Sequence, residues 1–177
     1  DNGLTSELIE AIEANIAKVG ITPAQDSAIA LISNTSGYYN TAFGIGALDT
    51  IRNGINNTAI GHSALASNTD GSGNTAVGGG ALESNFAEDN TAIGRGALEL
   101  NTSGHSNTAL GANALRGNVI GGSNTAVGRH ALFFNNGSAN TALGGGSLQN
   151  SLTGDNNVAI GYEALRDNST TSQNSSP

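Results

Sequence analysis

The chain has 177 residues, of which 11% are charged, 4% are aromatic and 26 are glycine, a composition unlike that of an average globular enzyme. Its net charge of −8 and its single lysine, Lys18, argue against nucleic acid or anionic membranes as partners, because both select for clustered cations. No apolar run is long enough to span a bilayer, and the absence of Cys and Met excludes disulfide and thiol chemistry.

The first residue, Asp1, follows no Met and no tag-like leader. Two interpretations fit this start: a mature product from which a signal peptide has been removed, or an excised fragment. We expect the first, and therefore expect an extracellular or cell-surface protein.

Residues 1–19 form the one segment with a helical pattern, with Thr5 or Ser6 as the cap and Gly20 as the stop. Its apolar residues follow a 3-4-3 spacing, at Ile9, Ile12, Ile16 and Val19. This spacing predicts either an oligomerisation seam of three or four helices or a helix that caps the end of the following domain. We therefore treat 1–26 as an N-terminal helix and connector.

A nine-residue motif, Asn-Thr-Ala-φ-Gly-x-x-Ala-Leu with φ a bulky apolar residue, first occurs at Asn40–Leu48. Seven further copies follow at steps of 17, 17, 16, 17, 17, 16 and 17 residues. They begin at Asn57, Asn74, Asn90, Asn107, Asn124, Asn140 and Asn157. A half unit at Ala30–Gly37 precedes them, so the repeat domain is expected to cover 27–168, with a polar, flexible tail at 169–177.

Short apolar segments separated by Gly and Asn are typical of β-strands and tight turns. We predict an all-β fold, a parallel β-solenoid or β-roll of eight to nine coils of 16–17 residues, with neighbouring backbones about 4.8 Å apart. The Gly of each motif is expected at a corner that other residues resist. These are Gly44, Gly61, Gly78, Gly94, Gly111, Gly128, Gly144 and Gly161.

The expected core consists of the φ and Leu positions of the motif. The φ residues are Phe43, Ile60, Val77, Ile93, Leu110, Val127, Leu143 and Ile160, and the Leu residues are Leu48, Leu65, Leu82, Leu98, Leu115, Leu132, Leu148 and Leu165. Alternation along a strand puts Thr and φ on one side and Asn and Ala on the other. Because Val158 replaces Thr in the last copy, we expect the Thr and φ side to face the interior.

The Ala of the motif then faces outward, and it is Ala in all eight copies, which water would not require. A partner chain packed against this column explains its small size, and a cramped corner within one chain is the alternative. The predicted oligomer interface is Ala42, Ala59, Ala76, Ala92, Ala109, Ala126, Ala142 and Ala159, together with the helical seam.

The opening Asn of each copy predicts a ladder of side-chain amides that bond along the stack. A second Asn column marks the other turn, where the two 16-residue units are shortened. Variable exposed loops are where recognition is expected. The candidates there are Phe86, Val119, Ile120, Phe133 and Phe134, which could also pack on neighbouring coils.

No constellation for catalysis, metal binding or cofactor binding is apparent. His62, His105 and His130 fall at three different repeat positions, and Asp70 and Asp155 lack the regular recurrence of calcium-binding solenoids. Left-handed β-helix acyltransferases are a remote enzymatic alternative, but their apolar-Gly signal recurs every six residues, whereas Ile60-Gly61 recurs once per coil. We expect no enzyme activity.

The Asn-Thr-Ala-φ-Gly array, closing with Asn157–Gly161, resembles the head repeats of trimeric autotransporter adhesins. Similar arrays occur in phage tail fibres and other secreted fibrous proteins. The resemblance covers about residues 30–168 and implies a left-handed parallel β-roll, three chains around an axis, and adhesion to a host-surface or matrix ligand.

Two functions follow as hypotheses. The first is a secreted, non-enzymatic subunit of an extracellular fibre or adhesive appendage, assembled by stacking coils head to tail. The second is a trimeric receptor-binding head of an adhesin or phage fibre. In both, the main partner is a further copy of the chain.

Overall fold

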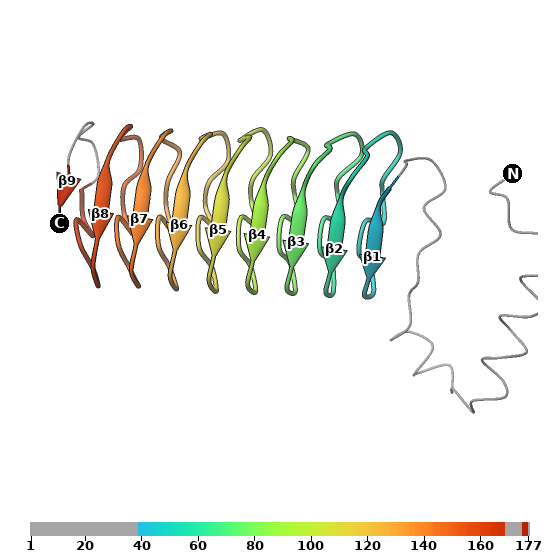
Figure 1. The fold of residues 1–177 in the computed structure, drawn as a ribbon, viewed down its shortest axis with the longest axis horizontal. Coiled ribbons are helices and arrows are strands. Elements are labelled where there is room, and N and C mark those ends of the chain that lie inside the picture. The colour runs from blue at the N-terminus through green and yellow to red at the C-terminus, as the bar shows by residue number, and fades with distance from the viewer. Residues whose placement is uncertain (1–38, 169–174, 177) are drawn as a thin grey trace, which may run out of the picture.

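The computed structural model describes residues 39–168 and 175–176, and its regular structure is one parallel sheet in chain order, β1 to β9. Each motif copy contributes one short strand. The strands are β1 (Thr41–Phe43), β2 (Thr58–Ile60), β3 (Thr75–Val77), β4 (Thr91–Ile93), β5 (Thr108–Leu110), β6 (Thr125–Val127), β7 (Thr141–Leu143), β8 (Val158–Ile160) and β9 (Ser175–Ser176). Figure 1 shows the coils stacked along the long axis of the molecule. The predicted all-β parallel solenoid is confirmed.

The coils stack in register, so that each motif position lies beside its own copy in the next coil. Thr41 pairs with Thr58, Ala42 with Ala59 and Phe43 with Ile60, and the same pattern continues through β7 and β8. We number the coils 1 to 8 from Asn40, Asn57, Asn74, Asn90, Asn107, Asn124, Asn140 and Asn157. Each side chain is therefore a member of a column that runs the length of the rod.

The two ends of the chain lie mostly outside the described residues. The expected helix and connector at 1–26, with the seam formed by Ile9, Ile12, Ile16 and Val19, fall there. Of the expected polar tail, the structure describes Ser175–Ser176, which pair with β8. Val158 pairs with Ser175 at the usual step of 17 residues, so this pair continues the stack.

Backbone hydrogen bonds outside the strands also run from coil to coil. The Leu48 N–H donates to the Ala64 carbonyl at 3.0 Å, and the Ser63 N–H donates to the Ile45 carbonyl at 2.8 Å. At the variable loop, the Phe86 N–H donates to the Thr102 carbonyl at 3.1 Å. A coil thus satisfies much of its perimeter through its neighbours, and its stability depends on stacking.

The interior is filled by the Leu column and by two columns of Ala. Leu65, Leu82, Leu98, Leu115, Leu132 and Leu148 have no exposed surface, as predicted for half of the core. The other half of that prediction is wrong, because the φ side chains point away from this cluster and are about half-exposed. The buried partners are instead the Ala of the strand and the Ala that precedes Leu, such as Ala109 and Ala114.

The buried Asn side chains explain this orientation. Asn57 accepts a hydrogen bond from a backbone N–H of the next coil, so its amide must lie inside the stack. Alternation along the strand then turns Ala59 inward, and turns Thr58 and Ile60 outward. The replacement of Thr by Val158 was misleading, since Val158 is itself exposed, at 37%.

The prediction that the strand Ala column faces outward as an oligomer interface is therefore wrong in its premise. Ala59, Ala76, Ala92, Ala109, Ala126, Ala142 and Ala159 are fully buried within one chain, and Ala42 in the first coil is partly buried. A side chain with no exposed surface offers no contact area to a partner. Its small size fits the alternative explanation, a confined interior of the coil itself.

The predicted Asn ladder is confirmed. From coil to coil, the backbone N–H of the opening Asn donates to the side-chain oxygen of the preceding opening Asn, as for Asn107 to Asn90 and Asn124 to Asn107, both at 2.9 Å. The second Asn column closes the other corner: Asn101 donates its amide to the Gly104 carbonyl, and Asn85 in a short unit donates to the Ala87 carbonyl, both at 2.8 Å. Reaching two residues instead of three absorbs the deletion.

The corners require unusual backbone conformations. Gly61 has φ +131°, and a Cβ added there would lie 2.7 Å from the Gly78 carbonyl carbon, so close stacking excludes a side chain as well. The buried Leu column turns the chain in the left-handed region, with φ near 50° at residues such as Leu98 and Leu115. Left-handed backbone costs an L-residue roughly 1–2 kcal/mol, which burial of a leucine, worth about 1.5–3 kcal/mol, offsets.

We predict that Asn107→Ala lowers the free energy of unfolding by about 1–3 kcal/mol, because it leaves buried polar groups of Asn124 and the Gly121 carbonyl without their partner. Urea denaturation followed by circular dichroism measures the change. Asn136→Ala is the control, since Asn136 also accepts a backbone N–H, that of Val119, but lies in solvent. Equal losses in the two variants would contradict a buried ladder.

Candidate functional site

The outer face of the sheet carries an apolar stripe, which we call the outer stripe. It consists of the φ residues Phe43, Ile60, Val77, Ile93, Leu110, Val127, Leu143 and Ile160, one per coil. The six larger side chains are 39–50% exposed, and the two valines are partly buried. With coils about 4.8 Å apart, eight coils give a stripe roughly 34 Å long.

Thr side chains flank the outer stripe, because Thr occupies the other outward position of each strand. Thr41, Thr108 and Thr125 are exposed, and Val158 in coil 8 extends the apolar surface. The face is a regular strip of hydroxyl, methyl and larger apolar groups without charges. A contiguous apolar surface of this kind marks an interaction face and offers no group for acid, base or nucleophilic chemistry.

The predicted recognition residues lie at the surface. Phe86, Ile120 and Phe134 are 51%, 64% and 49% exposed, Val119 is 36% exposed and Phe133 is partly buried. The Phe133 and Phe134 rings make an edge contact with centroids 4.4 Å apart, so these two pack on one another while Phe134 stays accessible. The structure leaves their role in recognition a prediction.

Sequence reasoning missed Leu152, which is 51% exposed. It follows the second Asn position of its coil, as Phe86 and Val119 do in theirs. Aligning the loops by that position would have found it. The loop edge therefore presents a second, interrupted apolar column, separated along the coil from the outer stripe.

The titratable side chains do not converge. His62, His105 and His130 lie at three different positions of the coil, as predicted, and no group of three His, Asp or Glu suited to a metal ion occurs in residues 39–168. The pKa of His130 is lowered by partial burial and by the nearby Arg129. The ring therefore stays neutral near pH 7 and contacts the Asn113 amide at 3.2 Å.

One ion pair links neighbouring coils. Arg116 donates through Nε and a terminal nitrogen to the two Glu99 carboxylate oxygens, at 2.8 and 2.9 Å. The hydrogen bond and charge of Arg116 lower the pKa of Glu99, whose side chain is 24% exposed. At the loop edge, the hydrogen bond from Asn53 lowers the pKa of Asp70. Both carboxylates contribute to coil-to-coil contacts.

Comparisons of the chain with family models, curated proteins and solved structures found no match. Within the described part of the chain, no helix has the length and apolar character that crossing a membrane requires. The class of protein that fold and surface define is a parallel β-solenoid repeat protein, with an apolar outer face and no assembled catalytic group in residues 39–168.

We predict that Glu99→Gln lowers the free energy of unfolding by up to about 1 kcal/mol at pH 7, as for other partly exposed pairs. The Glu99 pKa lies below its ordinary value of 4.5, so the stabilisation is complete above that pH and is lost as the pH falls through the lowered pKa. Urea denaturation at pH 7 and pH 3 measures it.

The matched control is Glu83→Gln, one coil earlier at the same position and in neither ion pair of the described residues. A wild-type advantage over Glu99→Gln that persisted undiminished at pH 3 would contradict the pair as its source.

Proposed function

We propose that the protein is a non-enzymatic, secreted structural subunit of an extracellular fibre or adhesive appendage, built by stacking solenoid coils end to end. The observation that carries the proposal is the uniform junction between successive coils. In every junction from coil 1 to coil 8, the residue after the opening Asn donates its N–H to the opening Asn carbonyl of the next coil, at 2.8 Å where the length is recorded. A junction between two chains needs no other chemistry.

The edges of the stack support end-to-end growth. Strand edges carry backbone donors and acceptors that pair with any in-register strand. The sequence holds a half unit before coil 1, at 30–37, and Ser175–Ser176 extends the register beyond coil 8. Partial coils at opposite ends complement each other if the half unit of one chain continues the stack of its neighbour.

Electron microscopy of the purified chain over a range of concentrations tests this proposal. We expect unbranched filaments whose number and length grow with concentration, and a cross-β spacing near 4.8 Å along the filament axis in diffraction. Discrete short particles at every concentration would rule out head-to-tail assembly.

A second candidate, a trimeric receptor-binding head, is favoured by the outer stripe. Three chains around an axis and adhesion are what the resemblance to adhesin heads implies. The buried Ala column leaves no surface for such an interface, whereas the half-exposed φ column does. Packing three stripes together would remove their apolar surface from water, at a gain of about 25 cal/mol per Å². In this arrangement the loop edges remain free for a ligand.

We predict that Leu110→Lys raises the monomer fraction at least about tenfold, because a buried, unpaired ammonium group opposes stripe-to-stripe packing. Native mass spectrometry and analytical ultracentrifugation measure the oligomer. The control is Ile120→Lys, which places the same charge on the loop edge of the same coil, where Ile120 is 64% exposed. A wild-type chain that is monomeric throughout, or equal effects of the two variants, would exclude the stripe as the interface.

A further inference from the structure

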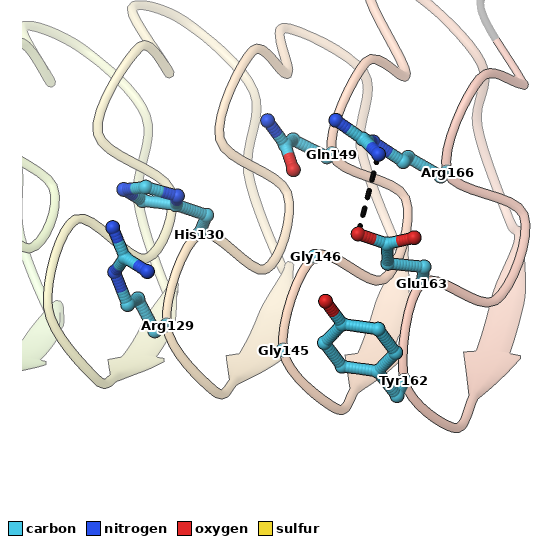
Figure 2. A pocket seen from close by; sticks show the side chains of 8 residues that line it. All are labelled: Arg129, His130, Gly145, Gly146, Gln149, Tyr162, Glu163 and Arg166. Atoms are coloured by element: carbon cyan, nitrogen blue, oxygen red, sulfur yellow. Dashed lines mark hydrogen bonds and ion pairs between the residues drawn. The ribbon is translucent and has the colours of Figure 1, made fainter.

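A shallow hollow of about 250 Å³ lies on the side of the rod across coils 6, 7 and 8. Its lining residues come from equivalent positions of the three coils. They are Arg129, His130, Gly145, Gly146, Gln149, Tyr162, Glu163 and Arg166. Figure 2 shows Arg129 and His130 on one side and Tyr162, Glu163 and Arg166 on the other, with Gly145 and Gly146 between them.

The hollow exists because coil 7 lacks side chains where its neighbours have large ones. Gly145 shares its column with Arg129 and Tyr162, and the first coil carries Ile45 there. The backbone does not require glycine at Gly145: a Cβ would meet its nearest neighbour, Tyr162 Cδ2, at 3.6 Å, an ordinary contact. The gap is thus a surface feature and not a by-product of the corner geometry that the preceding Gly144 serves.

The width of the gap suits one ring-sized ligand. Coils 6 and 8 are two stacking steps apart, so the side chains that flank Gly145 leave the backbone about 10 Å from each other. The Tyr162 side is a ring that lies beside Gly145 and is 81% exposed. An exposed aromatic ring next to a vacant position is a platform for the C–H face of a ligand ring.

The remaining lining groups are polar and form hydrogen bonds in fixed directions. Glu163 and Arg166 hold each other through an ion pair of 3.2 Å, and Gln149 adds an amide. Arg129 takes part in neither ion pair of the described residues. A purely apolar ligand would strip water from these groups without replacing its hydrogen bonds, whereas a polyhydroxylated ligand replaces them.

The local charge differs in sign from that of the chain. The protein carries −8 overall, but the hollow contains two guanidinium groups, Arg129 and Arg166, and one carboxylate, Glu163. With His130 neutral, the sum is +1. A guanidinium group outside any ion pair favours a carboxylate, which it binds through two parallel N–H groups.

We propose that this hollow binds one acidic sugar residue of a glycan, with its pyranose ring stacked on Tyr162 and its carboxylate on Arg129. The platform selects a ring with an apolar face, the polar lining selects hydroxyl groups, and Arg129 selects the acid. Since all of these groups belong to one chain, binding does not depend on fibre or trimer formation. If the chain is an adhesive subunit, the hollow supplies a ligand class for it.

The test uses the full-length chain with four probes: glucuronic acid, N-acetylneuraminic acid, glucose, and an acetylated peptide of three glutamates. Saturation-transfer difference NMR and titrations followed by protein NMR shifts measure binding. We expect either or both acidic sugars to bind, glucose to bind more weakly, and the peptide to bind at least about tenfold more weakly than the better sugar.

Two variants at matched positions separate the hollow from the rest of the surface. Gly145→Ile fills it with the residue that coil 1 carries and is expected to abolish binding. Gly79→Ile changes the equivalent residue of coil 3, where the flanking residues are His62 and Arg95, and is expected to leave binding unchanged. Tyr162→Ala, which removes an exposed ring, is expected to weaken binding about tenfold or more. Arg129→Gln is expected to remove the preference for acidic sugars over glucose.

Several outcomes would overturn the proposal: no saturation transfer to either acidic sugar, unchanged binding in Tyr162→Ala, or peptide binding as tight as that of the sugars, which would indicate a simple anion site. Binding by a chain that forms no filaments would leave this proposal standing and overturn only the fibre, so the two failures are distinguishable.

Discussion

In-register stacking of coils is the constraint on which the rest of this structure depends. The recorded backbone hydrogen bonds outside the strands run mainly from one coil to the next, and each strand pairs with the same three motif positions of its neighbour. A residue type that suits one coil therefore suits its copy above and below. This is why the motif keeps its Asn, Ala, Gly and Leu while the exposed positions between them vary.

The buried Asn side chains convert that constraint into an orientation. An amide inside the stack satisfies a backbone N–H of the following coil, and period-two alternation then assigns every other residue of the strand. Ala has to be inside with Asn, and the bulky φ residue has to be outside with Thr. The apolar outer stripe follows from the polar ladder within, and the surface open to a partner is set by the same hydrogen bonds that hold the coils together.

Periodicity alone predicted the repeat boundaries, the parallel β-solenoid, the Asn ladder and the Gly corners, because these depend on spacing and residue type. It did not predict which side of the strand is the interior. Alternation defines two sides without naming them, and the bulk of φ together with Val158 pointed to the wrong one. The deciding information was that Asn57 is tied to the backbone of the next coil, a contact made across 17 residues.

The surfaces were predictable to different degrees. Phe86, Ile120 and Phe134 are exposed apolar residues in loops that sequence alignment marks as variable. The hollow beside Tyr162 was not foreseen, since Gly145 looked like one more glycine of a glycine-rich repeat. Its meaning emerges only when the residues one coil before and one coil after are placed beside it. In a solenoid, neighbours in space are about 17 residues apart, and a single copy of the motif conceals them.

The most direct test of this account compares two adjacent residues of β5 by thiol accessibility. The chain has no cysteine, so Ala109→Cys and Leu110→Cys each introduce the only thiol. Ala109 is fully buried and Leu110 is 45% exposed. We expect the Leu110→Cys thiol to react with a polar disulfide reagent in the native protein at low concentration, and the Ala109→Cys thiol to react only after unfolding. Rapid reaction at 109 with protection at 110 would contradict the orientation from which the core, the outer stripe and the proposed interface all follow.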